Sequence, residues 1–503
     1  MRWSHLSALA LLSAAQLLAQ PKAQISGFVR DSSTAIVQQA AISILNLDTG
    51  IRRSTVSNSE GFYAVSSLTA GQYKVTVRKS GFTTIAQTGI ALHAMDSGRL
   101  DFTLDISSVR EEITVGSIPQ LFNTSDASSG LISTRDPAEA LPINGRGLQG
   151  LIDLAPGVLT TPATAGEAGQ FSANGQRPAT NYFTVDGVSA NNGVSGSGLP
   201  GQFSGAALPA MTAIGSLHNL VSLGELDELR VQTSTYAPEY GRLPGAQVAV
   251  TTRSGSNEFR GEIFGSIRHE KASANDWFAN AAGLSALPQR LTDAGGTVGG
   301  PVLRNRTFFL LSSEQLRLRQ PVTFLIPVPS LQARERAPES VRALLQAFPL
   351  PDGPEAGAGI SLHTARTSYP ADVGTTSFRL DQAIPDSGIL FFRYNYSPSS
   401  NSAGYLQRNQ ASFHSHTGTF GIITAMGPRF TNDLRIGTTR TSARSEWLPG
   451  AAAIDLRSFF PSPGLPAPGL PSEGQDQNLY AIGIRGFGQI IAGDPGESRQ
   501  TTW

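Results

Sequence analysis

The clearest alternation of apolar and polar positions in the chain lies between residues 258 and 268. Apolar or small residues occupy every second position from Phe259 to Ile267, and charged or polar residues stand between them, except at Phe264. This period of two predicts a strand with two unlike faces. Over about ten residues it is typical of a transmembrane β-barrel strand, with lipid outside and a wet lumen inside. A strand in a soluble sheet is the alternative that this segment leaves open.

The same alternation recurs further along the chain. Segments 377–384 and 389–397 predict a hairpin that turns at Pro385 to Gly388. We expect the polar members to face the lumen: Arg379, Asp381, Arg393 and Asn395. We expect the apolar members to face lipid: Phe378, Leu380, Phe392 and Tyr394. Segments 417–426 and 432–442 predict a second pair of strands.

Two Pro-rich stretches, 320–376 and 443–477, separate these strand pairs. We expect both to be extracellular loops that carry ligand contacts. Residues 330–348, within the first stretch, predict a loop helix.

Residues 24–106 predict a small all-β domain. Short runs rich in Val, Ile, Phe, Tyr and Thr alternate there with Gly, Ser, Asn and Asp, a pattern typical of a β-sandwich. Gly61 and Gly71 stand where turns need a residue without a Cβ. The residues expected to fill or flank the core are Phe62, Tyr63, Tyr73 and Val75.

Residues 1–23 predict a secretory signal peptide. Arg2 precedes an apolar run from Leu6 to Leu18, which is too short to span a bilayer, and polar residues follow the run. Cleavage is expected after Ala19 or Ala23. A buried first helix is the alternative, but nothing amphipathic continues the run.

Composition narrows the class of protein. A length of 503 residues is enough for about three domains. Lys plus Arg and Asp plus Glu both number 38, so net charge gives no attraction to nucleic acid or to an anionic membrane. Mean hydropathy is -0.10, and no later stretch is apolar for about 18 residues, which excludes helical membrane spans. The absence of cysteine excludes disulfides, Cys-ligated metals and thiol nucleophiles.

Motifs for catalysis are missing from the sequence. It contains no phosphate-binding Gly-Lys-Ser/Thr loop, no G-x-S-x-G elbow and no H-E-x-x-H zinc motif. His414 and His416 would share one side of a strand, but no third metal ligand is spaced nearby. We therefore expect no enzymatic activity, no cofactor and no metal.

Two consecutive segments carry a resemblance to a known family. Residues 231–242, VQTSTYAPEYGR, and residues 245–261, GAQVAVTTRSGSNEFRG, closely resemble the plug-to-barrel junction of TonB-dependent outer-membrane receptors of the Oar-like type. The residues of this junction are Tyr240, Gly241, Arg242, Ser254, Gly255 and Asn257. The resemblance implies that segments 226–232 and 246–252 are the closing strands of a plug domain.

The resemblance also implies a division of the chain. It gives a signal peptide at 1–23, a carboxypeptidase-regulatory-like sandwich at 24–106, a linker and plug at 107–256, and a partial barrel at 257–503. The sandwich is similar to transthyretin-like domains, which are also grouped with carbohydrate-binding-like folds. It resembles only the accessory domain of carboxypeptidases and not their catalytic domain.

Two segments resemble parts of the family's plug. Residues 141–158 look like its "LPLNGR" segment and the helix after it, with a buried stripe of Leu148, Leu151, Ile152 and Leu154. Residues 171–192 look like its hairpin, in which an Asp-Gly turn accepts positive φ angles cheaply. The plug-motif residues are Asn144, Gly145, Arg146, Asn174, Gly175, Arg177, Asp186 and Gly187. Their polar members either serve turns and solvation or face ligand at the plug apex.

Residues 107–118 lie where the family carries its TonB box. In the family, the TonB box pairs edge-on with a periplasmic energy-coupling protein. The candidate residues in this sequence are Glu112, Ile113, Thr114 and Val115. Main-chain pairing needs only an extended and accessible segment, so little side-chain specificity is expected. An inert linker strand is the alternative.

Residues 291–318 look like the second and third strands of the family's barrel. The tight turn between them is expected to contain Gly299, Gly300, Pro301 and Asn305, with Phe308 and Phe309 at an aromatic girdle. Family barrels have roughly 22 strands, yet only about half of the chain follows Asn257. An open half-barrel exposes strand edges to lipid at a large cost. We therefore expect a truncated product, or a half that another polypeptide completes.

The fold class that follows is mostly β, with a transthyretin-like sandwich, an α/β plug and an incomplete antiparallel transmembrane barrel. The expected function is TonB-dependent import of an extracellular ligand across the outer membrane. A surface carbohydrate-binding or adhesion protein without transport is the alternative. The expected partners are the TonB system, outer-membrane lipid and a ligand such as a peptide or oligosaccharide, but not nucleic acid. The sandwich is expected to be periplasmic.

Overall fold

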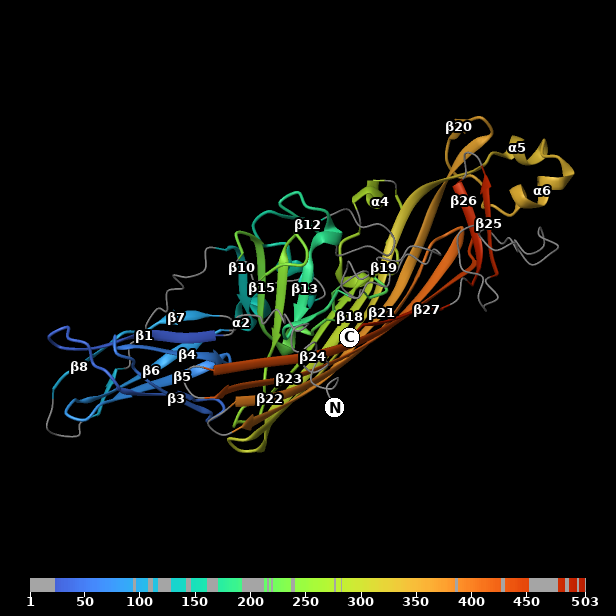
Figure 1. The fold of residues 1–503 in the computed structure, drawn as a ribbon. Helices are drawn as coiled ribbons and strands as arrows, with labels where there is room; N and C mark the ends of the chain where they lie inside the picture. Colours follow the sequence, from blue (N-terminus) through green and yellow to red (C-terminus); the bar gives the residue numbers. More distant parts are fainter. Residues whose placement is uncertain are drawn as a thin grey trace, which may run out of the picture.

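Strands dominate the computed structural model of the chain (Figure 1). The described residues are 23–93, 96–106, 112–115, 128–141, 146–160, 171–191, 212–214, 217–218, 220–236, 240–275, 277–281, 283–384, 388–426, 430–451, 478–484, 488–494 and 497–502. The predicted signal peptide lies outside them, apart from its last residue. Three parts follow one another along the chain: an N-terminal sandwich, an inner domain and a large wall of strands.

The N-terminal sandwich, residues 23–115, contains two sheets. One is built from β1 (Ala23–Asp31), β4 (Phe62–Leu68), β7 (Ser97–Arg99) and β8 (Phe102–Leu104). The other runs in the order β3 (Arg52–Val56), β2 (Ala41–Asn46), β5 (Gly71–Arg78), β6 (Thr84–Leu92) and β9 (Glu112–Val115). Alternate residues of β1, β2, β4, β5, β6 and β8 fill the core between the sheets. Tyr63, Tyr73 and Val75 are buried in this core as predicted, and Phe62 packs against Phe28 with ring centroids 5.3 Å apart.

The inner domain, residues 128–256, is a five-stranded sheet with two short helices. Its strand order is β10 (Ser129–Thr134), β15 (Leu226–Ser234), β16 (Gln247–Thr252), β13 (Tyr182–Val185) and β14 (Val188–Ser189). β11 (Val158–Thr160) and β12 (Phe171–Ala173) form a separate pair, and the helices are α2 (Arg135–Ala140) and α3 (Leu148–Ile152). The predicted strands at 226–232 and 246–252 are confirmed. Three of the four residues predicted to be buried after residue 147 are buried, but Leu154 is 58% exposed because α3 ends two residues before it.

The wall is an antiparallel sheet of eleven strands. In spatial order its main strands are β17 (Arg260–His269), β18 (Arg290–Leu303), β19 (Thr307–Pro329), β21 (Ile360–Ile384), β22 (Gly388–Ala403), β23 (Gln407–Met426), β24 (Phe430–Pro449), β26 (Gly488–Asp494) and β25 (Asn478–Ile484). β20 (Glu355–Gly357) pairs with β21, and β27 (Glu497–Thr502) pairs with β24. Among the described strands no pairing joins β17 to β25, so the sheet is curved but not closed.

The wall strands have the two unlike faces that their sequence predicts. On the outer face, Phe259, Ile263 and Ile267 are 71%, 95% and 79% exposed. Phe378, Phe392 and Tyr394 are exposed on the same face. The predicted lumen residues Arg379, Asp381, Arg393 and Asn395 are all buried on the opposite face. The four predicted polar side chains therefore point toward the inner domain, and these exposed apolar side chains point away from it.

Much of the stretch predicted as a loop between residues 320 and 376 is strand. β19 continues to Pro329 and β21 begins at Ile360, with only α5 (Leu331–Glu335), α6 (Glu339–Gln346) and β20 between them. The prolines in the later part of β19 stand where one edge of the strand has no partner. Pro321 lies beyond Arg319, the last residue of β19 that pairs with β18, so its missing N–H costs no ladder bond on that side.

The other predicted loop and the predicted helix need similar corrections. β24 continues to Pro449, while residues 452–477 lie outside the described part of the chain. The helix predicted between 330 and 348 is two short helices, α5 and α6.

The turn between β18 and β19 was predicted correctly for Asn305 but wrongly for three other residues. Gly299, Gly300 and Pro301 belong to β18, and the turn is formed by residues 304–306, where Asn305 has φ 61°. Gly300 is required inside the strand because the ring of Phe259 occupies the space of a side chain there. Phe308 is fully buried on the inner face, and only Phe309 faces outward, 6.2 Å from the ring of Phe259. Adjacent residues of a strand cannot share one face.

The two ends of the wall differ. The end near the sandwich carries the short turn at 304–306, and the opposite end carries α5, α6 and β20 (Figure 1). Short turns on one side and long connections on the other are typical of outer-membrane barrels. Within the described residues, no helix combines the length and the apolar character needed to cross a membrane.

We expect the substitution Ile263→Arg to impair insertion of the wall into the outer membrane. The Ile263 side chain lies on the outer face, and a charge there costs about 2–4 kcal/mol near the bilayer midplane. Leu303→Arg is the matched control, because Leu303 is 57% exposed at the turn end of the wall, where the cost falls to about 0–1 kcal/mol. Outer-membrane fractionation with heat-modifiable gel mobility measures the effect. Equal yields of both variants would contradict a lipid-facing outer face.

Candidate functional site

The inner domain lies against the inner face of the wall (Figure 1). Its strand β14 contacts β24, where Val188 occupies the space that a side chain at Gly437 would need. The hydrophobic core of the domain is its own and is built from buried residues of its strands and of α3. The contacts between domain and wall are different in character, because they include buried charged side chains.

The turn at Asp186 and Gly187 is the first of these contacts. It connects β13 to β14 with φ angles of 48° and 80°, as predicted for an Asp-Gly turn. The Asp186 carboxylate accepts hydrogen bonds from the backbone N–H of Thr252, at 2.9 Å, and from its hydroxyl, at 2.8 Å. From the wall, Arg435 donates to the Asp186 carbonyl oxygen at 2.9 Å. A side chain at Gly187 would collide with this arginine.

Arg379 of β21 binds the same turn. Its Nη1 donates to the carbonyl oxygen of Thr252 at 2.9 Å and lies 3.4 Å from the Asp186 carboxylate. Its Nε and Nη2 face the Asp381 carboxylate on the same strand, at 2.9 to 3.2 Å. The guanidinium also lies 4.8 Å from the ring centroid of Phe391. Arg379 thus joins two strands of the wall to the end of β16.

A second buried ion pair joins Arg393 of β22 to Glu225 of the inner domain. Arg393 Nη2 donates to Glu225 Oε1 at 3.0 Å and to the Leu220 carbonyl oxygen at 3.1 Å, and both charged side chains are at least 98% buried. The same carboxylate accepts from the Ser222 N–H at 3.0 Å and from the hydroxyl of Ser377 on β21. Glu225 is therefore held by groups from both sides of the interface.

Arg146 of the predicted plug motif lies against β17. Its guanidinium is 3.9 Å from the ring centroid of Phe264, the one residue that broke the alternation of this strand. It also interacts electrostatically with Asp293 of β18 and Glu314 of β19, two buried acids that have no hydrogen-bond partner among the described residues. A neighbouring ion pair joins Arg135 of α2 to Glu262.

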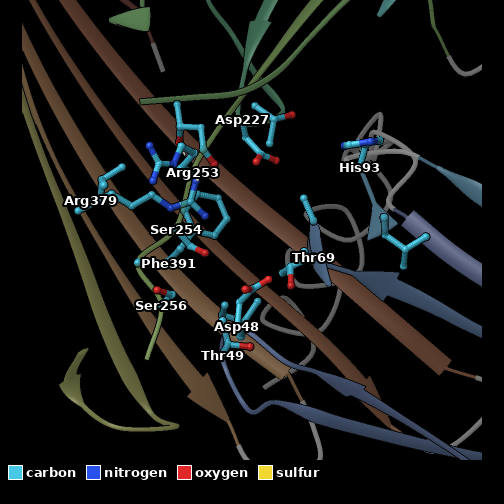
Figure 2. Close-up of a pocket in the computed structure, with 18 of the residues that line it drawn as sticks. Asp48, Thr49, Thr69, His93, Asp227, Arg253, Ser254, Ser256, Arg379 and Phe391 are labelled. Carbon is cyan, nitrogen blue, oxygen red and sulfur yellow. Dashed lines mark hydrogen bonds between the residues drawn. The ribbon is translucent and has the colours of Figure 1, made fainter. Parts of the chain in front are cut away.

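A chamber of about 440 Å³ lies where the sandwich, the inner domain and the wall meet. Figure 2 shows Asp48, Thr69 and His93 on the sandwich side and Asp227, Arg253 and Arg379 on the opposite side. The lining is mixed in charge and mostly polar. No described group of three or more potential metal ligands is present.

An ion pair also connects the sandwich to the inner domain. Arg230 of β15 donates to Glu228 on the same strand at 3.0 Å and lies 3.6 Å from Asp96 of the sandwich. Glu228 is 1% exposed, and burial raises the pKa of its carboxyl to about 7, with Arg230 opposing the rise and Asp96 adding to it. Burial likewise raises the pKa of Asp227 to about 6.

The sandwich also contacts the turn end of the wall. The backbone N–H of Asn257 donates to the Asp48 carbonyl oxygen at 2.9 Å, and the Asn257 side chain bonds Asn305 in both directions at 2.8 Å. Ser66 and Thr431 are joined by a bond of 3.3 Å. Ile51 packs against a cluster of apolar wall residues: Ile389, Phe391 and Ile423.

The remaining predicted site residues divide into three groups. Ser254 lines the chamber, and Gly255 lies so close to the backbone of Phe309 that no side chain fits. Arg242 lies 5.7 Å from the ring of Tyr182, within the connection that also contains Tyr240 and Gly241. Asn174 and Gly175 form a turn with positive φ, and Arg177 precedes a short helical turn. Asn144 and Gly145 lie outside the described residues.

Asp186 does not face the long loops. It lines the chamber at the sandwich end of the wall, so it is not placed at an apex that could meet an extracellular ligand. Sequence reasoning identified Asp186 as a turn residue but missed its bond to Arg379. It also missed Glu225, Glu228 and Arg230. The available signal was a run of charges inside an otherwise apolar strand, which usually marks a buried partner.

The two predicted neighbours His414 and His416 have aromatic partners. They lie on the outer face of β23, with ring nitrogens 3.0 Å and 2.8 Å from the hydroxyls of Tyr396 and Tyr394. His416 stacks on Tyr396 with ring centroids 4.6 Å apart. These contacts fit an aromatic belt on the outer face better than a metal site.

Comparisons with known proteins identify two parts of the chain, the sandwich and the wall. Residues 251–337 and 334–503 match the family model of the outer membrane beta barrel domain, and residues 24–105 match that of the carboxypeptidase regulatory-like domain. The TonB-dependent transporter Oar of Myxococcus xanthus is 24% identical over 270 residues, which cover 51% of this chain and 23% of the relative. The chain thus spans about a quarter of that relative's length.

Two solved structures are similar to this chain at low sequence identity. The outer membrane transporter YddB from Escherichia coli is 14% identical, with a TM-score of 0.44 over 74% of this chain and 44% of that one. The siderophore receptor PirA from Acinetobacter baumannii is 13% identical, with a TM-score of 0.36 over 63% and 45% of the two chains.

We expect Arg393→Ala to destabilise the contact between the inner domain and the wall by about 3–5 kcal/mol. The substitution leaves the Glu225 carboxylate buried without its cation. The double variant Arg393→Met with Glu225→Gln removes both charges and is expected to cost less than the single one. Limited proteolysis of the full chain in detergent reports release of the inner domain from the wall. Equal protease sensitivity of the single and double variants would contradict a role for charge pairing.

We expect Glu228→Gln to stabilise the chain above pH 7 and to lose this advantage as pH falls. The folded state raises the pKa of Glu228 from 4.5 to about 7, so it favours the neutral carboxyl. The wild type therefore gains stability as pH falls through 7 toward 4.5, by up to about 3 kcal/mol. Thermal unfolding at about pH 8 and about pH 5 measures the difference. Glu60→Gln, at an exposed turn of the sandwich, controls for loss of a carboxylate, and a pH-independent difference at Glu228 would contradict the shift.

Proposed function

The chain belongs to the outer membrane beta barrel family and is a homologue of TonB-dependent transporters, and on this basis we propose that it binds an extracellular ligand and admits it through a plugged wall of strands. The outer membrane is its location. In this proposal the inner domain is the plug, and the sandwich lies in the periplasm. The relatives are named as transporters and receptors, and the proposal includes no covalent step on the protein.

The observation that carries the proposal is the charged attachment of the inner domain to the wall. A domain that only needed to stay in place could pack through apolar contacts, which are often as stable as buried ion pairs. Arg379 and Arg393 instead hold Asp186 and Glu225 through directed bonds. Such bonds are lost within a short displacement and can exchange with water, so a small movement of the plug can release it.

The proposed path runs from the long connections to the chamber. Ligand binds at the end of the wall that carries α5 and α6, opposite the sandwich (Figure 1). Displacement of the inner domain breaks the contacts around Arg379 and opens the lumen toward the chamber, which that arginine lines. The ligand class remains a peptide or an oligosaccharide in this proposal, because the described loops carry no motif that selects one.

Energy for the displacement is proposed to come from the TonB system. Residues 112–115 form an extended strand, β9, as the pairing with a coupling protein requires. Pulling on this strand would act on the inner domain through the chain that follows it.

The experiment that tests this function uses two variants at residue 113. Ile113→Pro removes a backbone N–H and is expected to lower binding of the periplasmic domain of TonB more than tenfold, because the pairing is made by the main chain. Ile113→Ala keeps the N–H and is expected to bind within about threefold of the wild type. Binding is measured with the full chain in detergent.

The same variants report on import in cells. Mass spectrometry of spent medium compares compounds depleted by the wild type with those depleted by the proline variant and by a strain without TonB. A compound taken up only with the wild type and TonB together identifies the ligand. Uptake that is indifferent to TonB, or no binding by the wild type, would contradict the proposal.

A further inference from the structure

The candidate coupling segment is part of the sandwich. β9, residues Glu112–Val115, lies beside β6 in a parallel pair, with Glu112 opposite Thr84 and Val115 opposite Gln87. It is the last strand of the five-stranded sheet β3-β2-β5-β6-β9. The four residues expected from the sequence to meet the coupling protein are thus the four that extend this sheet.

The position of β9 leaves one of its edges open. One edge pairs with β6, and the other pairs with no strand in the described part of the chain. An edge strand presents a row of backbone N–H and C=O groups that can template a further strand. Addition of an extended segment to such an edge is a recurrent mode of recognition.

The strand beside β9 is itself paired on its other edge. β6 pairs with β5 from Ile85 opposite Val77 to Leu92 opposite Gly71, with one irregularity between Gln87 and Ile90. Ala86, Ile90 and Leu92 of β6 are buried in the sandwich. β9 is therefore held in extended conformation by a strand that belongs to a packed core.

The chain is fixed close to where β9 begins. The backbone N–H of Thr83 donates to the Asp105 carbonyl oxygen at 2.8 Å, and Phe82 and Ile106 form an isolated bridge. These contacts hold the residues that precede the coupling segment against the start of β6. They limit the positions that β9 can adopt to those near the edge of the sheet.

The sandwich itself has a fixed place at the turn end of the wall. Asp96 lies 3.6 Å from Arg230 of the inner domain, and Asp48 accepts from the N–H of Asn257 at the start of the wall. The open edge of β9 is thereby presented at one defined side of the assembly.

We propose that the N-terminal sandwich is a docking platform, which presents residues 112–115 as a preformed edge strand to which an extended strand of the periplasmic coupling protein adds. The proposal rests on the transport function proposed above and names the surface at which its partner binds. The partner strand becomes the sixth of the sheet, and β9 keeps its ladder to β6. A linker without a support would have to order on binding and pay the conformational entropy of doing so. The accessory domain removes that cost.

The alternative arrangement is that β6 masks the coupling segment, so that β9 must leave the sandwich before the partner binds. A disulfide between the two strands separates these arrangements. Thr84 and Glu112 are register partners, and the chain has no cysteine of its own, so the pair Thr84→Cys with Glu112→Cys can bond only within itself. The bond fixes β9 on β6 and leaves its other edge unchanged.

The experiment measures binding of the purified periplasmic domain of TonB to the full chain in detergent, with the cysteine pair oxidised and reduced. We expect the oxidised chain to bind within about twofold of the reduced chain and of the wild type. A loss of tenfold or more on oxidation, restored by reduction, would overturn the platform and show that β9 must detach. The two single-cysteine variants, treated in the same way, control for each substitution and for the oxidant.

Failure of the platform and failure of the transport proposal give different results. If the wild type binds and only the oxidised pair does not, the platform is wrong and the coupling remains. If the wild type itself does not bind, both are wrong. If Ile113→Pro binds as the wild type does, the partner recognises another segment, and the platform is overturned whatever the cysteine pair shows.

Discussion

The structure depends on the mutual neutralisation of charges that are buried between the inner domain and the wall. When a domain covers the polar face of a strand, the charged side chains on that face need partners of opposite charge. A buried charge without a partner is very costly in free energy. Arg393 would be such a charge in an empty wall closed to water, whereas Arg379 already has the Asp381 carboxylate beside it on β21. Glu225 supplies the partner of Arg393, and Asp186 adds a second carboxylate at Arg379. The backbone carbonyls of Thr252 and Leu220 accept further hydrogen bonds from these arginines. Neither surface is complete without the other.

The same principle links the third part of the molecule. The sandwich meets the inner domain through Asp96 and Arg230, and it meets the wall through Asp48 and Asn257. These contacts surround a chamber and do not form a packed apolar interface. The sandwich therefore closes one end of the space that the wall surrounds, and it is held by a few polar bonds and by the apolar contact of Ile51 with the wall. Separation of these parts would expose little hydrophobic surface.

The sequence predicted the direction of side chains far better than their partners. Alternation alone placed Arg379 and Arg393 on the inner face, because the period of a strand decides its two sides. It could not predict Asp186 and Glu225 as their partners, since pairing across an interface depends on how two separately folded parts meet. Phe264 is instructive: as an exception to the alternation it had no explanation from its own strand, and Arg146 of another domain provides one.

The wrong predictions came from local signals that the tertiary structure overrides. Pro321 suggested a loop, but it lies in β19 beyond the last residue that pairs with β18, so no hydrogen bond to β18 is lost there. Gly300 suggested a turn, but its missing side chain makes room for the ring of Phe259. Leu154 has the spacing of a buried helical residue, but α3 ends before it.

The length of β19 and β21 has a consequence for what the molecule first encounters. β21 has 25 residues, which at about 3.3 Å each is a rod of roughly 80 Å, and a tilt of about 40° leaves some 60 Å along the membrane normal. The hydrocarbon layer is only about 30 Å thick. In the orientation proposed above, the paired strands extend beyond the bilayer, and α5 and α6 lie tens of ångströms from the lipid. A ligand arriving from outside would then meet α5 and α6 before it came near the lipid, so its binding and its passage would be separated in space.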